Sequence, residues 1–135
     1  MGSTSAPGSG GKRAQDYAAV RDWPGYFDLM LGKPARETLV SALALIAKED
    51  ASRGDVGSRE RIAVDLGCGE GRDTLELLSR GWRVLAIDAH PRSFELLEPR
   101  VRPEDRARLR TLVSTFEGAE WARGVDLFNA SFSLP

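Results

Sequence analysis

The stretch that decides the fold is IAVDLGCGEG, residues 62–71. A short apolar run is interrupted by one acid and ends at three glycines, which alternate with other residues. Residues 72–80 follow with several leucines, so the pattern predicts a strand, a sharp glycine turn and a helix. Glycine lets the backbone turn sharply and approach a ligand closely, where any Cβ would obstruct it. The free N–H groups at the start of the helix are then directed towards the bound molecule.

The alternation of strands and helices continues beyond this motif. Residues 84–87 predict a second strand, residues 109–114 a third and residues 125–132 a fourth. A helix that begins at Pro91 separates the second strand from the third. Near-continuous apolar strands with helices between them are typical of βαβ units and of a parallel sheet covered on both faces. The predicted fold class is therefore α/β, with a doubly wound parallel sheet.

The chain divides into three parts by composition. Residues 1–12 are rich in glycine and serine and are interpreted as a disordered leader. Residues 13–60 form an N-terminal helical segment with a linker, and residues 61–135 form the βαβ part. These boundaries predict one domain whose chemistry lies in its second half.

Inside the N-terminal segment two helices are expected. The first covers residues 13–21 and ends before Pro24. The second, residues 34–48, carries apolar residues at helical spacing on one face. Residues 49–60 are polar and contain glycine, so they are expected to form a surface linker.

Composition excludes several classes of function. The chain has 19 basic and 20 acidic residues and a formal net charge of -1, so no basic surplus favours nucleic acid or an anionic membrane. A single cysteine permits neither an intrachain disulfide nor a cysteine-rich metal site, and no metal site is expected. No apolar run approaches the roughly 18 residues of a membrane helix, and a cytoplasmic location is the default expectation.

The residue at the end of the second predicted strand indicates a ribose-binding site. Asp88 stands there, and a carboxylate at that place can accept hydrogen bonds from the two hydroxyls of a ribose. Two nucleoside cofactors fit such a layout. The dinucleotide fingerprint G-x-G-x-x-G would need its third glycine at position 72, which is Arg72. The glycines at alternate positions, preceded by Asp65, therefore disfavour a nicotinamide dinucleotide.

The stretch VDLGCGEGRDTLELLSRGWRVLAIDAHP, residues 64–91, resembles the first two motifs of the class I S-adenosylmethionine-dependent methyltransferases. VDLFNASFSLP, residues 125–135, is similar to the fourth-strand region of small bacterial members of the tellurite-resistance type. The resemblance implies a Rossmann-like sheet with four strands in the order 3-2-1-4 and with its C-terminal strands missing. The chain is thus expected to be the cofactor-binding half of a methyltransferase domain.

The resemblance also implies roles for individual residues. S-adenosylmethionine would lie along the glycine loop with its amino group near Asp65 and its ribose on Asp88. Phe116 would stack on the adenine and Glu117 would meet its exocyclic amine. The full expected cofactor-binding set is Asp65, Gly67, Cys68, Gly69, Gly71, Asp88, Ala89, Phe116, Glu117 and Asn129. The candidates on the acceptor side are Tyr26 and Ser131, and the resemblance names no catalytic base.

Several of these residues also have an ordinary structural interpretation. Asp88 would serve equally as a helix-capping acid before Pro91, and Phe116 as a core aromatic. Glu117 also fits a solvated loop charge, and Cys68 a small packing residue. The sole histidine, His90, is expected to face solvent in a loop.

The leading functional hypothesis is methyl transfer to a small-molecule acceptor. The alternative from another class is a non-catalytic cofactor-binding or interaction module that keeps the loop and lacks an acceptor site. Neither the acceptor nor the oligomeric state follows from the sequence, because acceptor selectivity lies in variable loops.

Overall fold

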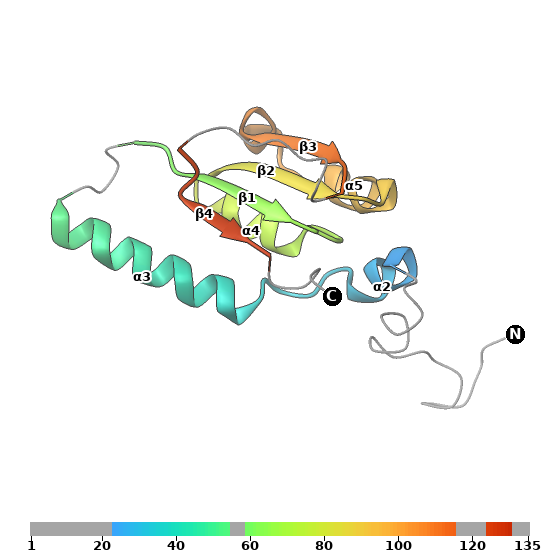
Figure 1. Ribbon diagram of the computed structural model, residues 1–135, viewed down its shortest axis with the longest axis horizontal. Coiled ribbons are helices and arrows are strands. Elements are labelled where there is room, and N and C mark those ends of the chain that lie inside the picture. Colours follow the sequence, from blue (N-terminus) through green and yellow to red (C-terminus); the bar gives the residue numbers. More distant parts are fainter. Residues whose placement is uncertain (1–22, 55–58, 116–123, 131–135) are drawn as a thin grey trace, which may run out of the picture.

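The computed structural model describes residues 23–54, 59–115 and 124–130. Figure 1 shows a small sheet with helices packed beside it. The helices and strands are α2 (Trp23–Met30), α3 (Glu37–Arg53), β1 (Ile62–Leu66), α4 (Arg72–Ser79), β2 (Arg83–Asp88), α5 (Pro91–Leu97), the 3-10 turns η1 (Glu98–Arg100) and η2 (Pro103–Arg108), β3 (Leu109–Val113) and β4 (Leu127–Asn129).

The four described strands form one parallel sheet in the order β3-β2-β1-β4. This confirms the predicted order 3-2-1-4. In the register, Asp65 of β1 stands between Ala86 of β2 and Asn129 of β4. Parallel strands present their carboxyl ends at one edge, so the glycine loop after β1, the end of β2 and the end of β4 meet there.

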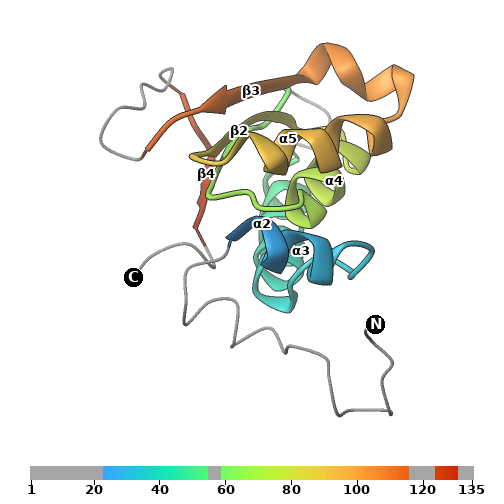
Figure 2. The same ribbon diagram turned by 90° about the vertical axis from the view of Figure 1, so that its right-hand side faces the viewer.

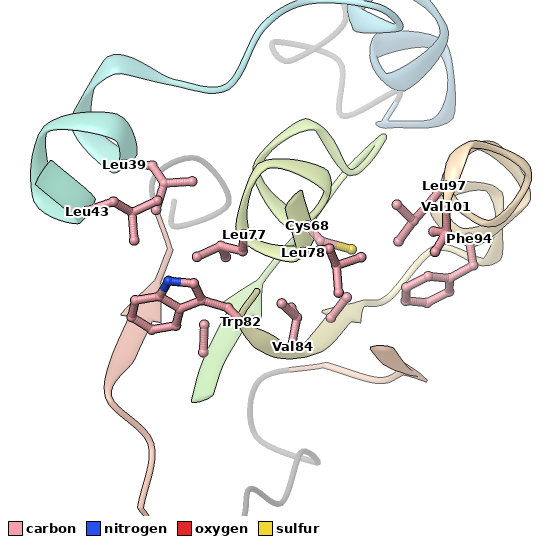
Figure 3. Packing of buried hydrophobic residues seen from close by; sticks show 12 residues of the cluster. Leu39, Leu43, Cys68, Leu77, Leu78, Trp82, Val84, Phe94, Leu97 and Val101 are labelled. Atoms are coloured by element: carbon pink, nitrogen blue, oxygen red, sulfur yellow. The ribbon is translucent and has the colours of Figure 1, made fainter. Parts of the chain in front are cut away.

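Helices α3, α4 and α5 pack on one face of the sheet. That face presents Ala63, Val84 and Ala86, which are essentially inaccessible to solvent. Figure 2 shows the helices on the same side of the strands. Figure 3 shows the packed side chains, and the whole buried cluster consists of Leu39, Leu43, Ala63, Cys68, Leu77, Leu78, Trp82, Val84, Ala86, Phe94, Leu97 and Val101. Each fully buried leucine contributes about 1.5–3 kcal/mol of hydrophobic free energy.

The opposite face of the sheet carries the alternate residues of the same strands. Val64 on β1 pairs with Leu85 on β2 and with Phe128 on β4. Val64 is 1% exposed, whereas Phe128 is 51% exposed. The described helices that contribute to the buried cluster all lie on the first face, so the expected cover over this second face stays a prediction.

Helix α2 was not predicted, and both ends of α3 differ from the prediction. Pro24 lies in the first turn of α2, where its missing N–H costs no helical hydrogen bond, so it begins a helix that the sequence analysis did not expect. Helix α3 begins at Glu37 and continues through part of the predicted linker to Arg53, and Gly54 ends it with a φ of 72°.

The fourth strand is shorter than expected. Residues 125–126 and 130 are described and lie outside it, and residues 131–132 are outside the described part. The predicted helix at 13–21 and the leader at 1–12 also fall outside the described residues. Within the described ranges, every helix is too short or too polar to cross a bilayer.

Candidate functional site

The glycine loop folds back onto the end of β2. The N–H groups of Gly67 and Cys68 both donate to the carbonyl oxygen of Ile87, at 2.7 and 3.0 Å. Gly67 and Gly69 have φ values of 65° and 60°, a left-handed conformation that side chains other than glycine rarely adopt. The loop therefore keeps its shape through the glycines and through β2.

The Asp88 side chain binds the backbone of the same loop. Its Oδ2 accepts a hydrogen bond from the Gly69 N–H at 3.0 Å, and its Oδ1 accepts one from the His90 N–H at 2.9 Å. Each carboxylate oxygen retains further acceptor capacity, so Asp88 can still receive two hydroxyl groups. The capping alternative is not realised, because no side chain caps the N-terminus of α5.

Asp65 belongs to a buried polar cluster beside the loop. Thr74 Oγ1 donates to Asp65 Oδ2 at 2.7 Å. The amide nitrogen of Asn129 donates to Asp65 Oδ1 and to Asp73 Oδ2, at 3.0 Å in each case. The four side chains come from β1, α4 and β4, and they join the three elements at the carboxyl edge of the sheet.

Arg36 adds a positive charge to this cluster. Its backbone N–H donates to Asp73 Oδ1 at 2.9 Å, and its guanidinium contacts Asp73 Oδ2 at 3.1 Å. Arg36 immediately precedes α3, so this contact fastens the N-terminal segment to α4.

The protonation of Asp65 reflects this surrounding. Burial, together with the nearby charge of Asp73, raises the pKa of Asp65 to about 7. Hydrogen bonds from Thr74 and Asn129 and the charge of Arg36 act in the opposite direction. A cation brought to Asp65 would favour its ionised form.

Helix α2 lies against the loop through Phe27. A Cβ placed on Gly69 would be 3.4 Å from Phe27 Cε1, and the Phe27 ring meets the His90 ring edge-on with centroids 6.0 Å apart. His90 is therefore half-buried, and its expected exposure to solvent was wrong. Arg92 and Asp28 form an ion pair at 2.8 Å that also joins α5 to α2.

Gly71 is required for packing within the protein. Its φ is 95°, and an added Cβ would lie 2.5 Å from Leu97 Cδ1. The structure thus gives this glycine a role against α5, whereas the sequence suggested approach to a ligand. Glu70 beside it is 1% exposed, and burial raises its pKa.

The structure brings together most of the cofactor-binding set. The loop residues 65–71 lie beside Asp88 and Asn129 at one edge of the sheet. Ala89 follows Asp88 and is exposed, and Tyr26 is buried on α2 next to Phe27. Phe116, Glu117 and Ser131 lie outside the described residues, so their roles stay predictions.

Sequence reasoning missed four polar residues that shape the site. They are Arg36, Asp73, Thr74 and Ser93. Asp73 and Thr74 lie in the first turn of α4, directly after the glycine loop. Their position next to the loop was the one sequence signal that could have marked them as site residues. Among the described residues, no group of histidine, cysteine or acidic side chains could hold a metal ion.

Comparison with known proteins agrees with this geometry. A family model described as a methyltransferase domain matches residues 63–134, which is more than half of the chain. The chain belongs to the methyltransferase-domain family. Its sheet order and flanking helices are those of the class I methyltransferases, and the narrower likeness to tellurite-resistance enzymes is not confirmed. A search among curated proteins finds no match.

Three solved structures are similar to this methyltransferase domain, and the fold likeness rests on the first of them. Monomeric WbdD matches with a TM-score of 0.53 at 20% identity, over 80% of this chain and 25% of that one. The Burkholderia thailandensis 1,6-didemethyltoxoflavin-N1-methyltransferase, solved with S-adenosylhomocysteine, matches at 24% identity, with a TM-score of 0.48, over 87% and 48%. The glycopeptide N-methyltransferase MtfA matches at 21%, with a TM-score of 0.43, over 61% and 38%. The chain therefore spans a quarter to about half the length of these proteins.

Proposed function

We propose that this methyltransferase domain binds S-adenosylmethionine and transfers its methyl group to a small-molecule acceptor. The observation that carries the proposal is Asp88, a buried acid at the end of β2 that accepts the Gly69 N–H of a left-handed glycine loop. The family match supports the reaction class. The balanced charge gives no support to a nucleic-acid acceptor, which favours a small molecule. The single cysteine favours a cytoplasmic location.

The residues present fit the cofactor. Asp88 has acceptor capacity for two ribose hydroxyls beyond its two backbone bonds. Two buried carboxylates, Asp65 and Asp73, stand near one guanidinium, so the cluster can accommodate the positive charge of an amino group. Asn129 holds both carboxylates in place through one amide nitrogen.

In this mechanism the main task of the protein is to position the two reactants. S-adenosylmethionine supplies a methyl group that is already on a good leaving group. Asp88 would hold the ribose, and Gly67 and Gly69 would lie along the methionine part with Asp65 near its amino group. Phe27 on α2 would limit the access of water beside Gly69. Holding two reactants at near-attack distance contributes up to about 7–11 kcal/mol to such reactions. A base is needed only where the acceptor must lose a proton first.

A second candidate is a cofactor-binding module without turnover. This candidate is favoured by the length of the chain, which spans only 25% of the WbdD structure. Residues that bind an acceptor can lie in the parts of such larger proteins that this chain does not match. Binding of S-adenosylmethionine without methyl transfer, across a panel of amine, hydroxyl and thiol acceptors, would favour this candidate.

Thermal unfolding with and without ligand tests the proposal. S-adenosylhomocysteine at a large excess over its Kd is expected to raise the Tm of the chain, because it binds only the folded state. The same concentration of NAD is expected to give no shift. A folded sample that shows a shift with NAD and none with S-adenosylhomocysteine would contradict the proposed function.

A further inference from the structure

The carbonyl group of Gly69 is held by a side chain that the proposed cofactor contacts do not include. Ser93, on α5, donates its hydroxyl proton to the Gly69 carbonyl oxygen and is fully buried. The N–H of the same glycine donates to Asp88. Both polar groups of Gly69 are thus bound by side chains that lie on different elements.

Cys68 extends this chain of hydrogen bonds. Its Sγ lies 3.2 Å from Ser93 Oγ and 3.9 Å from the Gly69 carbonyl oxygen. The thiol carries one proton, which it can donate either to Ser93 Oγ or to the Gly69 carbonyl oxygen. Burial raises the pKa of the Cys68 thiol well above its ordinary value, so the thiol keeps its proton at neutral pH.

The direction of the Gly69 peptide matters for any ligand on the loop. The Gly69 N–H belongs to the peptide group before its Cα and the carbonyl belongs to the peptide group after it. With φ at 60°, both groups can rotate unless they are fixed, because glycine populates many conformations. A carbonyl turned outwards would present a negative dipole to the ligand. The Ser93 hydroxyl keeps this carbonyl directed towards α5.

We propose that Ser93 is a positioning residue. It holds the carbonyl that follows the Gly69 Cα while Asp88 holds the N–H that precedes it, so the two bonds together fix the torsions of Gly69 and keep the glycine loop and Asp88 in the geometry that receives the nucleoside. The proposal rests on the proposed function for its ligand, and on the three hydrogen-bonded side chains for its geometry. Ser93 does not touch the cofactor and acts through Gly69.

Titration calorimetry with S-adenosylhomocysteine tests the proposal on the full chain. Ser93→Ala is expected to raise the Kd about tenfold, the size of one lost buried hydrogen bond, because only the weak thiol donor of Cys68 then remains at the Gly69 carbonyl oxygen. Ser93→Cys keeps the shape with a weaker donor and is expected to fall between Ser93→Ala and the original chain. Val101→Ala is the control, because Val101 is also buried and its side chain carries no hydrogen-bonding group, while its backbone N–H donates to the Glu98 carbonyl in both chains. It is expected to lower Tm and to leave the Kd within twofold.

Hydrogen exchange without any ligand separates this proposal from the proposed function. The Gly69 amide is expected to exchange at least about tenfold faster in Ser93→Ala and unchanged in Val101→Ala, because only the first frees the loop. If the original chain binds no S-adenosylhomocysteine and the exchange still rises in Ser93→Ala, the proposed function fails while the restraint of Gly69 by Ser93 stands. Unchanged exchange of the Gly69 amide, or a Kd for Ser93→Ala within twofold of the original, would overturn the proposal.

Discussion

The amide nitrogen of Asn129, on the edge strand β4, donates to Oδ1 of Asp65 on β1 at 3.0 Å. The same nitrogen donates to Asp73 Oδ2, so one neutral side chain separates two buried carboxylates. A carboxylate accepts and cannot donate when ionised, which fixes the orientation of the amide. Asn129 therefore supplies one proton to each of the two acids and helps them to stand close together.

We predict that Asn129→Asp destabilises the fold by about 2–4 kcal/mol at pH 8. The substitution replaces the shared donor with a third buried negative charge. The loss is expected to be smaller at pH 5, where protonation relieves the repulsion. Urea denaturation at the two pH values measures it. Thr115→Asp adds the same charge at an exposed position and serves as the control. Equal losses for the two variants would contradict the account.

We predict from the raised pKa of Asp65 how the free energy of unfolding depends on pH. Its pKa is about 7 in the folded protein and about 3.8 when unfolded, so the folded state binds the extra proton between these values. The stability from this group is complete below about pH 3.8 and is lost as pH rises towards 7. The slope is at most about 1.4 kcal/mol for each pH unit. Asp65→Asn is expected to reduce the slope between pH 5 and 7 in urea denaturation, and an unchanged slope would be contrary evidence.

We predict that the contribution of Asp126 to stability depends on pH in the opposite direction, because its pKa is lowered. Its side chain accepts hydrogen bonds from Arg59, Arg61 and the Ile62 N–H, which lower its pKa to about 2. Its contribution is present above pH 3.8 and is lost as pH falls towards 2. Asp126→Ala should therefore cost about 1–3 kcal/mol at pH 7 and little at pH 2. The Kd for S-adenosylhomocysteine should not change, because Asp126 lies at the other end of the sheet, where β1 begins.

Gly71 and Gly81 form a matched pair. Both have positive φ, 95° and 89°, so alanine at either position costs about 1–2 kcal/mol of backbone strain. A Cβ at Gly71 also meets Leu97 Cδ1 at 2.5 Å, whereas nothing lies within 4 Å at Gly81. Gly71→Ala is therefore expected to lose about 1–3 kcal/mol more than Gly81→Ala in chemical denaturation. Equal losses would show that Leu97 moves aside without cost.

The sequence predicted the elements whose signals are local. The glycine loop, the strand before it and Asp88 follow from residue types that only a few conformations accommodate, and the strand order followed from the family resemblance. Helix α2 was missed because Pro24 was interpreted as a stop, although proline also begins helices. The length of α3 depended on Gly54, which the polar sequence around it concealed.

Long-range contacts within the site were not predictable in the same way. The contact between Arg36 and Asp73 spans 37 positions, and the one between Asn129 and Asp65 spans 64. No local pattern encodes which acid a distant arginine or amide will meet. Ser93 was missed for the same reason, because a lone serine after a proline has many ordinary roles.

Calorimetric titration of the folded chain with S-adenosylhomocysteine tests the central claim most directly. The account predicts saturable binding at one site, and a rise of at least about 100-fold in Kd for Asp88→Ala, which removes both the acceptor for ribose and the anchor of Gly69. Asp126→Ala is the control that should bind unchanged. No binding to the folded original chain, or equal binding by Asp88→Ala, would contradict the account.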